Sequence, residues 1–438
     1  MITRVEIDGF KSFQRFVLDL EPLTIIAGPN SAGKSNLFDG LQLLSRLAET
    51  DLSAAFEKGR GRIRDQFSWL RGEPGRFITL AVELLLPETA NGDEPLKQTR
   101  LRYEVSIERK EEPPTIEALV VAGEQLSPIA KGDDAWIAAH PEFGLFAKYD
   151  GGQLGLGAGK LHFEVDAGHD FHRDFDGPGA IIRDGATMAF DKDLRDSTVL
   201  SSHGVAGGRH IAAVRRELLS WRFPLVDVAK LRNSSEPGSA KTLAQDGANL
   251  PTVLAALPKA TVAAIQADLA DLVSDVRGFE IVLPTKEQLG IEVLFTDGER
   301  VPARILSDGT LRLLGFLTFL RSARAGSVIA HEEPENGIFP GRLVALLDKL
   351  VAETEPADEL PAQIILNTHS PVVLSVLGKR PSAIVLADKI TRTEQDSVRR
   401  STRMRHVAGE TATDRGATVA SRREVERLLE TARVDERP

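Results

Sequence analysis

The pattern of apolar and polar residues predicts strands at the start of the chain, followed by a helix. Residues 2–7 and 16–20 alternate apolar with polar side chains, which indicates strands with one buried face. Residues 23–27 (LTIIA) are continuously apolar, as is typical of a parallel strand buried on both faces. Residues 35–47 then place Leu and Phe at helical spacing. We therefore predict a strand, a loop and a helix in succession here.

The rest of the chain alternates between strand-like and helical patterns. Between residues 208 and 276 the pattern is helical, because Ile211, Val214, Leu218 and Trp221 share one helix face. Gly151-Gly152 and Asp297-Gly298 are predicted turns, and a last helix is expected at 422–431. The further expected strands are 77–86, 100–109, 115–121, 145–149, 161–165, 279–283, 290–295, 300–304, 327–333, 364–366 and 383–387.

Composition excludes several classes of protein. The 438 residues are 42% hydrophobic and 27% charged, which is ordinary for a globular protein with a large core. The net charge of −10 argues against a basic coat for nucleic acid, although a local groove stays compatible with it. Without cysteine there is no disulfide, thiolate zinc site or Cys nucleophile. The sequence has neither an eighteen-residue apolar run nor a signal-peptide core, so we expect a cytoplasmic protein that does not contact a membrane.

Residues 28–35 (GPNSAGKS) fit the phosphate-binding pattern G-x-x-x-x-G-K-[ST] between the expected strand and helix. Glycines let consecutive N–H groups face one anion, and the helix N-terminus adds positive potential. The Lys supplies a point charge for the β- and γ-phosphates, and the Ser hydroxyl suits Mg²⁺. The alternative is a glycine-rich turn with no ligand. The candidate ATP-binding residues are Gly28, Asn30, Ser31, Ala32, Gly33, Lys34, Ser35 and Asn36.

Three later segments carry candidate chemistry. Residues 306–312 (LSDGTLR) place Ser307 and Gly309 at the start of an apolar helix, whose N-terminus can bind an anion or simply be capped. Residues 327–333 (SVIAHEE) are an apolar strand that ends in two acids, for which surface charge is the alternative. His369 follows the strand at 364–366, at the edge of the sheet where ligands bind in open α/β folds; a structural histidine is the alternative.

Together these segments resemble the ATPase head of SMC, RecF and OLD-family proteins, which also carry a turn like GFKSF at residues 9–13. The resemblance extends to about Leu47 and runs again from about Leu306 to Ala387. It implies an α/β fold: a P-loop NTPase head of the ABC type with an antiparallel β-subdomain and a compact helical insertion. No TOPRIM-type nuclease domain follows, unlike in full-length OLD proteins.

The resemblance also implies roles for individual residues. Glu332, where the family usually has Asp, and Ser35 would bind Mg²⁺. Glu333 would activate the attacking water, and His369 would contact the γ-phosphate. The segment led by Ser307 and Gly309 would reach the nucleotide of a second copy, so that ATP joins two chains head to tail.

Several residues keep two interpretations at this stage. Lys11 and Ser12 of the GFKSF turn are either nucleotide contacts or, for Lys11, a solvated lysine. The Arg-rich loop at 60–76 either follows a DNA backbone or is a solvated connection, and Gln66 is the only nearby candidate for the family's Gln loop. The loop at 166–176 is either solvated or a metal site built from His169, Asp170, His172, Asp174 and Asp176.

We therefore expect an ATPase with four parts: an N-terminal lobe with the β-subdomain (1–205), a helical insertion (206–277), a C-terminal lobe (278–390) and a polar tail (391–438). In the tail, Arg399, Arg400, Arg403 and Arg405 form a basic cluster that suits acidic partners. The expected function is a Mg²⁺-dependent ATP switch in DNA-related processes such as repair or anti-phage defence. The alternatives are an ATP-gated scaffold for a separate effector protein without DNA contact, and a metal-dependent nuclease using the loop at 166–176.

Overall fold

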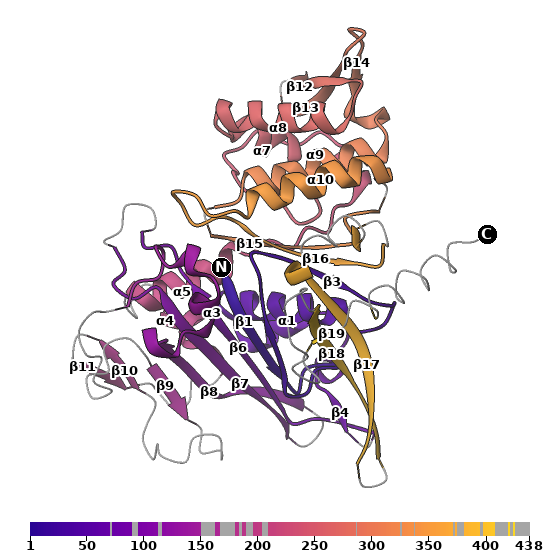
Figure 1. Cartoon of the computed structure of the whole chain (residues 1–438). Coiled ribbons are helices and arrows are strands. Elements are labelled where there is room, and N and C mark those ends of the chain that lie inside the picture. Colours follow the sequence, from indigo (N-terminus) through magenta and orange to yellow (C-terminus); the bar gives the residue numbers. More distant parts are fainter. Residues whose placement is uncertain are drawn as a thin grey trace.

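Figure 1 shows the computed structural model of the chain. The described residues are 1–70, 72–89, 95–112, 116–149, 163–166, 180–183, 186–189, 196–203, 209–285, 287–324, 326–336, 338–370, 373–374, 381–394, 397–407, 419–420 and 424. The helices are α1 Lys34–Leu47, α2 Leu52–Glu57, α3 Ala135–Ala139, α4 Val199–His203, α5 Arg209–Ser220, α6 Val228–Leu231, α7 Leu250–Ala256, α8 Lys259–Leu272, α9 Asp308–Arg321 and α10 Pro340–Glu353. Short 3₁₀ turns are η1 Ile63–Gln66, η2 Lys131–Asp133, η3 Pro141–Phe143, η4 Ala303–Ile305 and η5 Pro381–Ala383.

The strands form four sheets within the described residues. The first strands are β1 Ile2–Asp8, β2 Phe16–Asp19, β3 Leu23–Ala27, β4 Trp69–Leu70, β5 Glu73–Pro74, β6 Phe77–Leu85, β7 Arg100–Glu112, β8 Ile116–Pro128, β9 Phe163–Asp166, β10 Ala180–Arg183 and β11 Ala186–Ala189. The later strands are β12 Val276–Thr285, β13 Gln288–Phe295, β14 Arg300–Pro302, β15 Val328–Glu332, β16 Gln363–Thr368, β17 Ile384–Glu394, β18 Ser397–Val407 and β19 Val419–Ala420. The expected α/β class is confirmed.

The central sheet has the order β15-β16-β3-β17-β18-β19. Its strands β15, β16, β3 and β17 are parallel, so their carboxyl ends lie at one edge. Because both faces are covered, alternate residues of β3 enter different cores: Ile26 packs in the first and Ile25 in the second. Ile365 and Leu366 of β16 divide in the same way. This two-sided burial explains why the run LTIIA is continuously apolar.

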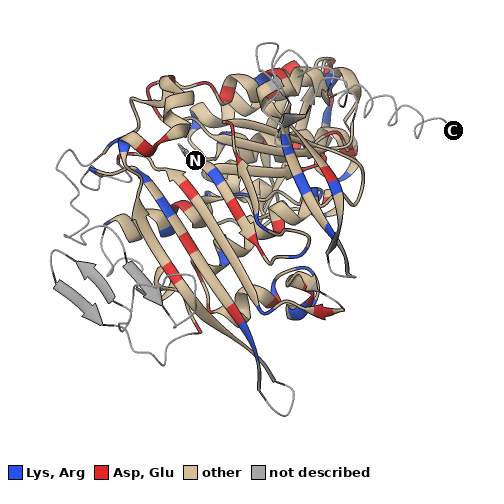
Figure 2. Cartoon of the chain, turned by 60° about the horizontal axis from the view of Figure 1, so that its bottom comes forward, with Lys and Arg blue, Asp and Glu red and all other residues tan. Residues whose placement is uncertain are grey.

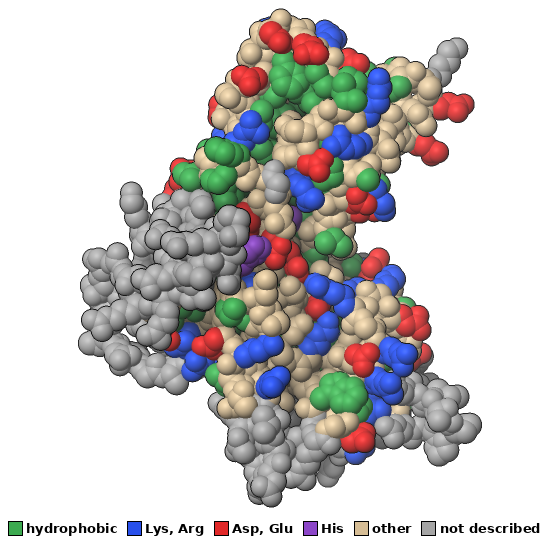
Figure 3. Space-filling view, turned by 90° about the vertical axis from the view of Figure 1, so that its right-hand side faces the viewer, with side chains coloured by type: hydrophobic (Ala, Val, Ile, Leu, Met, Phe, Trp, Pro, Cys, Tyr) green, Lys and Arg blue, Asp and Glu red, His purple; other side chains and the backbone are tan. Residues whose placement is uncertain are grey.

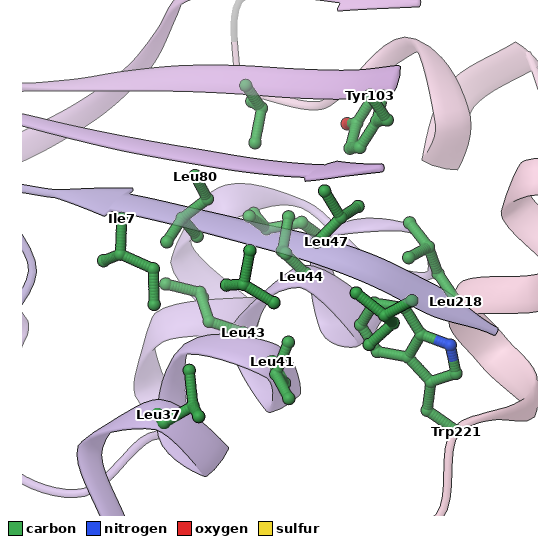
Figure 4. Close-up of a cluster of buried hydrophobic side chains, with 14 of the residues drawn as sticks. Ile7, Leu37, Leu41, Leu43, Leu44, Leu47, Leu80, Tyr103, Leu218 and Trp221 are labelled. Atoms are coloured by element: carbon green, nitrogen blue, oxygen red, sulfur yellow. The ribbon is translucent and has the colours of Figure 1, made fainter. Parts of the chain in front are cut away.

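The first core lies between the central sheet and an antiparallel sheet of order β11-β10-β9-β8-β7-β6-β1-β2. Helices α1 and α5 fill the space between them, and Figure 4 shows Leu37, Leu41 and Leu44 of α1 among side chains from the strands and Trp221. A Cβ on Gly40 would lie 3.2 Å from Cδ1 of Ile7, so the glycine lets α1 approach β1 closely. The packing of α1 fixes the direction in which its N-terminus points.

The outer face of the antiparallel sheet carries charges of both signs side by side (Figure 2). Arg102 pairs with Glu6 and Glu104, and Arg4 pairs with Asp19 and lies near Glu83. Such interleaved charge does not give the one-sign surface that a nucleic-acid backbone favours.

The second core covers the opposite face of the central sheet. Helices α6 to α10 and the sheet β12-β13-β14 contribute to it, and Figure 1 places α8, α9 and α10 together above β15 and β16. The predicted insertion at 206–277 therefore contributes α5 to the first core and α6, α7 and α8 to the second, so its helices do not form a unit of their own. The domain boundaries remain a prediction.

Two expectations about local structure are wrong. Residues 145–149 are not a strand but a turn after η3, because Phe143 and Phe146 pack around Trp136 and only Lys148 pairs with Thr99 in the manner of a strand. Residues 391–394 and 397–407, expected at the start of a polar tail, belong to β17 and β18, which pair antiparallel in the central sheet and are called the β17–β18 hairpin here. Two arginines of the expected basic cluster are paired across that hairpin, since Arg403 and Arg405 both contact Asp388.

The remaining predictions on local structure concern residues outside the described set. These are the turn at Gly151-Gly152, the loop at 166–176 apart from Asp166, and the helix at 422–431 apart from Glu424. Within the described residues, no helix is both long and apolar enough to span a membrane.

A buried carboxyl group in the first core makes the stability of the fold depend on pH. Glu124 accepts hydrogen bonds from the Tyr103 hydroxyl (2.9 Å) and the Val199 amide (2.8 Å), and burial raises its pKa to about 7 from the usual 4.5.

The unfolded chain releases the proton of Glu124 at lower pH than the folded chain does. We therefore expect the free energy of unfolding to fall by about 3 kcal/mol as pH rises from about 4.5 through 7. Glu124→Gln should remove that decline in urea titrations at pH 5, 6, 7 and 8; an unchanged pH dependence in the variant would contradict it.

Candidate active site

The phosphate loop joins the carboxyl end of β3 to α1. Gly33 has φ +92° and Ser31 has φ +63°, so the loop curls through left-handed conformations before Lys34 begins the helix. The Lys34 ammonium donates to the carbonyls of Gly28 (2.7 Å) and Pro29 (3.1 Å). Burial lowers the pKa of Lys34, against the opposing effect of three nearby glutamates, Glu333, Glu335 and Glu332. The ammonium thus lies folded over the loop, where it can turn from carbonyls to phosphate oxygens.

The strand β15 brings its terminal acid to the first turn of α1. The Ser35 hydroxyl donates to Oε2 of Glu332 over 3.2 Å. A hydroxyl and a carboxylate in contact are hard oxygen donors of the kind Mg²⁺ prefers. The pair therefore fits the predicted metal-binding role.

A chain of ion pairs connects this acid to the GFKSF turn. Arg60 contacts Oε1 of Glu332 (2.9 Å) and Asp39 of α1 (2.8 Å), and Asp39 also contacts the Lys11 ammonium (2.6 Å). Burial would lower the pKa of Arg60, but the carboxylates of Asp39 and Glu332 outweigh it and raise that pKa. Lys11 has only 13% of its side chain exposed, so it is not a solvated lysine. Arg60 supplies the positive charge beside Glu332 in this structure.

The next acid, Glu333, lies in a strained turn beside His369. Its φ of +50° is costly for a residue with a side chain, of order 1–3 kcal/mol. The turn is held by Asn367 of β16, whose backbone oxygen (3.0 Å) and side-chain oxygen (3.1 Å) both accept from the Glu333 amide. Oε1 of Glu333 lies 3.4 Å from Nδ1 of His369, and Asn336 donates to Oε2 over 2.7 Å. The strain and the contacts fix this carboxylate next to the imidazole.

Glu335, a residue that the sequence analysis did not select, supports the histidine. Its Oε1 accepts from the Thr368 hydroxyl (2.6 Å) and the His369 amide (3.2 Å), and lies 3.7 Å from the imidazole Nδ1. Its Oε2 is buried and has no hydrogen-bond partner within the described residues. A buried carboxylate oxygen without a donor is costly and is typical of a site that a ligand or proton completes.

The other candidate residues of the phosphate loop differ from one another in exposure and contacts. Asn30 and Ser31 are exposed, whereas Ala32 is buried. The Asn36 amide donates to the Ser12 hydroxyl over 2.8 Å, so the GFKSF turn does lie against the loop. Acidic and histidine side chains gather in a hollow between the upper and lower parts of the molecule (Figure 3).

The segment 307–309 is not brought to this site. Ser307 caps α9 by accepting from the Thr310 amide (3.3 Å), and Arg232 holds the preceding turn through the Leu306 carbonyl (2.7 Å) and pairs with Asp308. Within the part of the chain that is described, no hydrogen bond or ion pair joins residues 307–309 to residues 28–36. The N-terminus of α9 is therefore capped and exposed, and none of these contacts ties it to the phosphate loop of its own chain.

Gln66 and the loop at 166–176 are the two other candidates from the sequence. Gln66 is buried and donates to the Phe56 carbonyl over 2.8 Å, so it does not take the position of a Gln loop; Arg60 lies at the site instead. The metal-binding interpretation of the loop at 166–176 concerns residues outside the described set. Among the residues that are described, no group of three or more His, Asp or Glu side chains is arranged to hold a metal ion.

Four residues at the site were missed by sequence reasoning, namely Asp39, Arg60, Glu335 and Thr402. Asp39 gave a weak signal as an acid between buried positions of α1, and Arg60 was noted only as part of a basic loop. Glu335 lies in the run EEPEN, in which catalytic and metal-binding roles were assigned to the two preceding glutamates. Thr402, whose hydroxyl donates to the Ala32 carbonyl of the phosphate loop over 2.9 Å, gave no local signal, because this contact joins residues that are 370 positions apart.

Comparison with known families gives two matches that flank the middle of the chain. Residues 4–65 match the family model "AAA domain", and residues 224–375 match "AAA domain, putative AbiEii toxin, Type IV TA system". The first contains the phosphate loop, and the second contains Glu332, Glu333 and His369. No curated protein matches the sequence.

Several solved structures are similar in fold. One is an SmcHead bound to the C-winged helix domain of ScpA, with 15% identity, coverage of 92% of this chain and 97% of that chain, and a TM-score of 0.47. The SMC head domain from Thermotoga maritima has 13% identity, 93% and 99% coverage, and a TM-score of 0.38. An Smc head with an extended coiled coil, derived from Pyrococcus furiosus and bound to the C-terminal domain of ScpA, has 12% identity, 99% coverage of both chains and a TM-score of 0.43.

Proposed function

We propose that this chain, an AAA-domain protein of the ABC type whose motifs are those of SMC- and RecF-like ATPases, hydrolyses ATP with the help of Mg²⁺. One observation carries the proposal. The carboxyl ends of the adjacent parallel strands β15, β16 and β3 bring together Glu332 and Glu333, His369, and the loop of Lys34. Binding at this edge of the sheet is the usual position of ligands in open α/β folds.

Each residue takes a role suited to its position. The backbone N–H groups of the loop and the Lys34 ammonium bind the β- and γ-phosphates. Ser35 and Glu332 would hold Mg²⁺, which would neutralise charge on the phosphates. Glu333 accepts the proton of the attacking water, and His369, supported by Glu335, donates toward the γ-phosphate. Arg60 pairs with the Glu332 carboxylate, whose charge a bound metal would also neutralise.

The metal-binding role can be tested with the variant Glu332→Gln. The amide keeps the shape of the side chain but removes its charge, so we expect the Mg²⁺ concentration for half-maximal phosphate release to rise at least about tenfold. Wild-type turnover should vanish in EDTA. Glu299→Gln, at an exposed turn far along the chain, is the matched control. The same Mg²⁺ dependence in Glu332→Gln and wild type would contradict the assignment.

We also propose that two chains share each nucleotide. The fourteen-residue helix α9 has an exposed, serine-capped N-terminus, as an anion site requires. Beside it, Ile305 has 67% of its surface exposed, an apolar side chain that a second copy would cover. A head-to-tail pair would bring this helix tip to the phosphates held by Lys34 of the other copy. ATP then joins the pair, and hydrolysis releases it.

Two cellular roles for this switch are compatible with the surface of the molecule. A DNA-related role is supported by Arg62 and Arg64, which are exposed in the segment after α2 and could contact a phosphate backbone. A scaffold that binds and releases a protein effector is favoured by the net charge of −10 and by the use of Arg60 inside the site. ATP turnover measured with and without duplex DNA over a salt series separates the two, because only contact with a phosphate backbone gives salt-sensitive stimulation.

A further inference from the structure

The β17–β18 hairpin contacts the phosphate loop through Thr402. This threonine is buried, and its hydroxyl donates to the Ala32 carbonyl over 2.9 Å. Since that donation uses its only hydrogen, the Ser12 hydroxyl at 2.7 Å is the donor to Thr402, and Asn36 donates to Ser12 in turn. The Thr402 amide also donates to the Ser12 carbonyl over 2.9 Å. A directed chain of hydrogen bonds therefore ends on a carbonyl of the loop itself.

Both glycines that the phosphate-loop pattern requires, Gly28 and Gly33, lie against this hairpin. A Cβ on Gly33 would lie 1.9 Å from the Thr402 hydroxyl oxygen, and a Cβ on Gly28 would lie 2.3 Å from the carbonyl oxygen of Ala387 in β17. Neither approach is possible for a residue with a side chain. The loop is thus held at its first glycine by one strand of the hairpin and at its second glycine by the other.

The hairpin is itself fixed by charge pairs. Asp388 of β17 accepts from Arg403 (2.6 and 2.9 Å) and from Arg405 (3.0 Å), and Arg405 also contacts Glu424 (2.8 Å). Thr402 is paired with Lys389 in the strand register, one residue from Asp388. These pairs keep β18 at a constant position relative to β17 next to the loop.

We propose that Thr402 is a positioning residue of the nucleotide site and that the hairpin is a working part of it; this rests on the proposed function. The reason lies in the geometry of the peptide bond. In a planar trans peptide, the Ala32 carbonyl and the Gly33 N–H point in opposite directions. By holding the carbonyl, Thr402 directs the Gly33 N–H away from the hairpin and toward the concave side of the loop, where phosphate binds. ATP binding and the position of the hairpin are therefore coupled.

A matched set of variants tests this role. Thr402→Val keeps the shape and removes the hydroxyl, Thr402→Ser keeps the hydroxyl, and Thr391→Val removes an exposed hydroxyl on the opposite strand. The directed N–H binds substrate and transition state alike, so Thr402→Val should raise the Kd and KM for MgATP at least about tenfold, with kcat lowered less than about threefold. Thr402→Ser and Thr391→Val should stay within about twofold of wild type.

A second measurement needs no nucleotide. Hydrogen exchange of a peptide that spans residues 28–36 should be faster in Thr402→Val than in wild type, while exchange in α5 stays the same. In wild-type protein, MgATP should slow exchange in residues 397–407, and this protection should be lost in Thr402→Val.

The outcomes distinguish two failures. If wild type neither binds nor hydrolyses MgATP, the proposed function is wrong, and the exchange of the free loop still reports on Thr402. If wild type binds MgATP and Thr402→Val binds it equally well, the positioning role is wrong. Thr402→Ser behaving as poorly as Thr402→Val would also overturn it, because the hydroxyl would then not be the cause.

Discussion

Glu333→Gln is expected to lower kcat for ATP hydrolysis by about 10²–10⁴-fold while leaving ATP binding intact. The amide keeps the volume of the side chain and a hydrogen-bond acceptor for Asn336, but it cannot accept a proton from water. Because chemistry stops after ATP has bound, the variant should accumulate as an ATP-bound dimer. Phosphate release measures the first effect, and light scattering at saturating MgATP measures the second.

The control for this experiment is Glu359→Gln, since Glu359 is an exposed glutamate in the loop before β16. It should match wild type in both turnover and mass. A Glu333→Gln protein that turns over ATP within a few-fold of wild type would remove Glu333 from the chemistry. A variant that is inactive but stays monomeric with ATP would leave the chemistry in place and contradict the shared site.

Sequence patterns predicted the start of the site with little error because local interactions decide it. The strand at 23–27 has the expected bounds, and the helix ends at Leu47 as expected and begins one residue earlier, at Lys34. Apolar runs, glycine and helical spacing all act within a few residues, and here they agree with each other. The two family matches at 4–65 and 224–375 support the resemblance that was drawn from the motifs.

The errors come from contacts between distant parts of the chain. Residues 145–149 (LFAKY) are rich in apolar and aromatic side chains, as strands often are, but packing in the aromatic cluster of Phe143, Phe146 and Trp136 determines their path instead. The β18 strand is too polar to predict as part of a central sheet. Two of its arginines, Arg403 and Arg405, form ion pairs with Asp388 of β17, and Arg405 also pairs with Glu424. Such ion pairs cannot be predicted from the pattern of neighbouring residues.

The same reason explains which site residues were missed. Arg60 meets Glu332 across 272 residues, and Thr402 meets Ala32 across 370. A charged or hydroxyl side chain in a loop or strand has many uses, and only the fold selects one. The roles of the predicted residues themselves remain predictions, because geometry places them together without showing turnover.

Among the described residues, no hydrogen bond or ion pair joins the helix tip at Ser307 to the loop of Lys34, and this leads to a test that no single variant provides. If each site uses the loop of one copy and the helix tip of the other, a chain with Lys34→Ala and a chain with Ser307→Arg are both inactive alone. In a mixed pair, the intact loop of one chain meets the intact helix tip of the other. One of its two sites is then complete.

Mixing the two inactive proteins in equal amounts should therefore restore about a quarter of wild-type ATP turnover, because half of the random pairs are mixed and each has one complete site. Lys34→Ala mixed with Glu333→Gln is the matched control: both changes lie on the side of the site that one chain supplies, so every pair has two broken sites and no activity returns. No recovery in the first mixture, while both proteins still bind each other, would show that a single chain contains all of its own catalytic groups. Recovery in the control would show that Lys34 and Glu333 of one site come from different chains, which contradicts the division of the site proposed here.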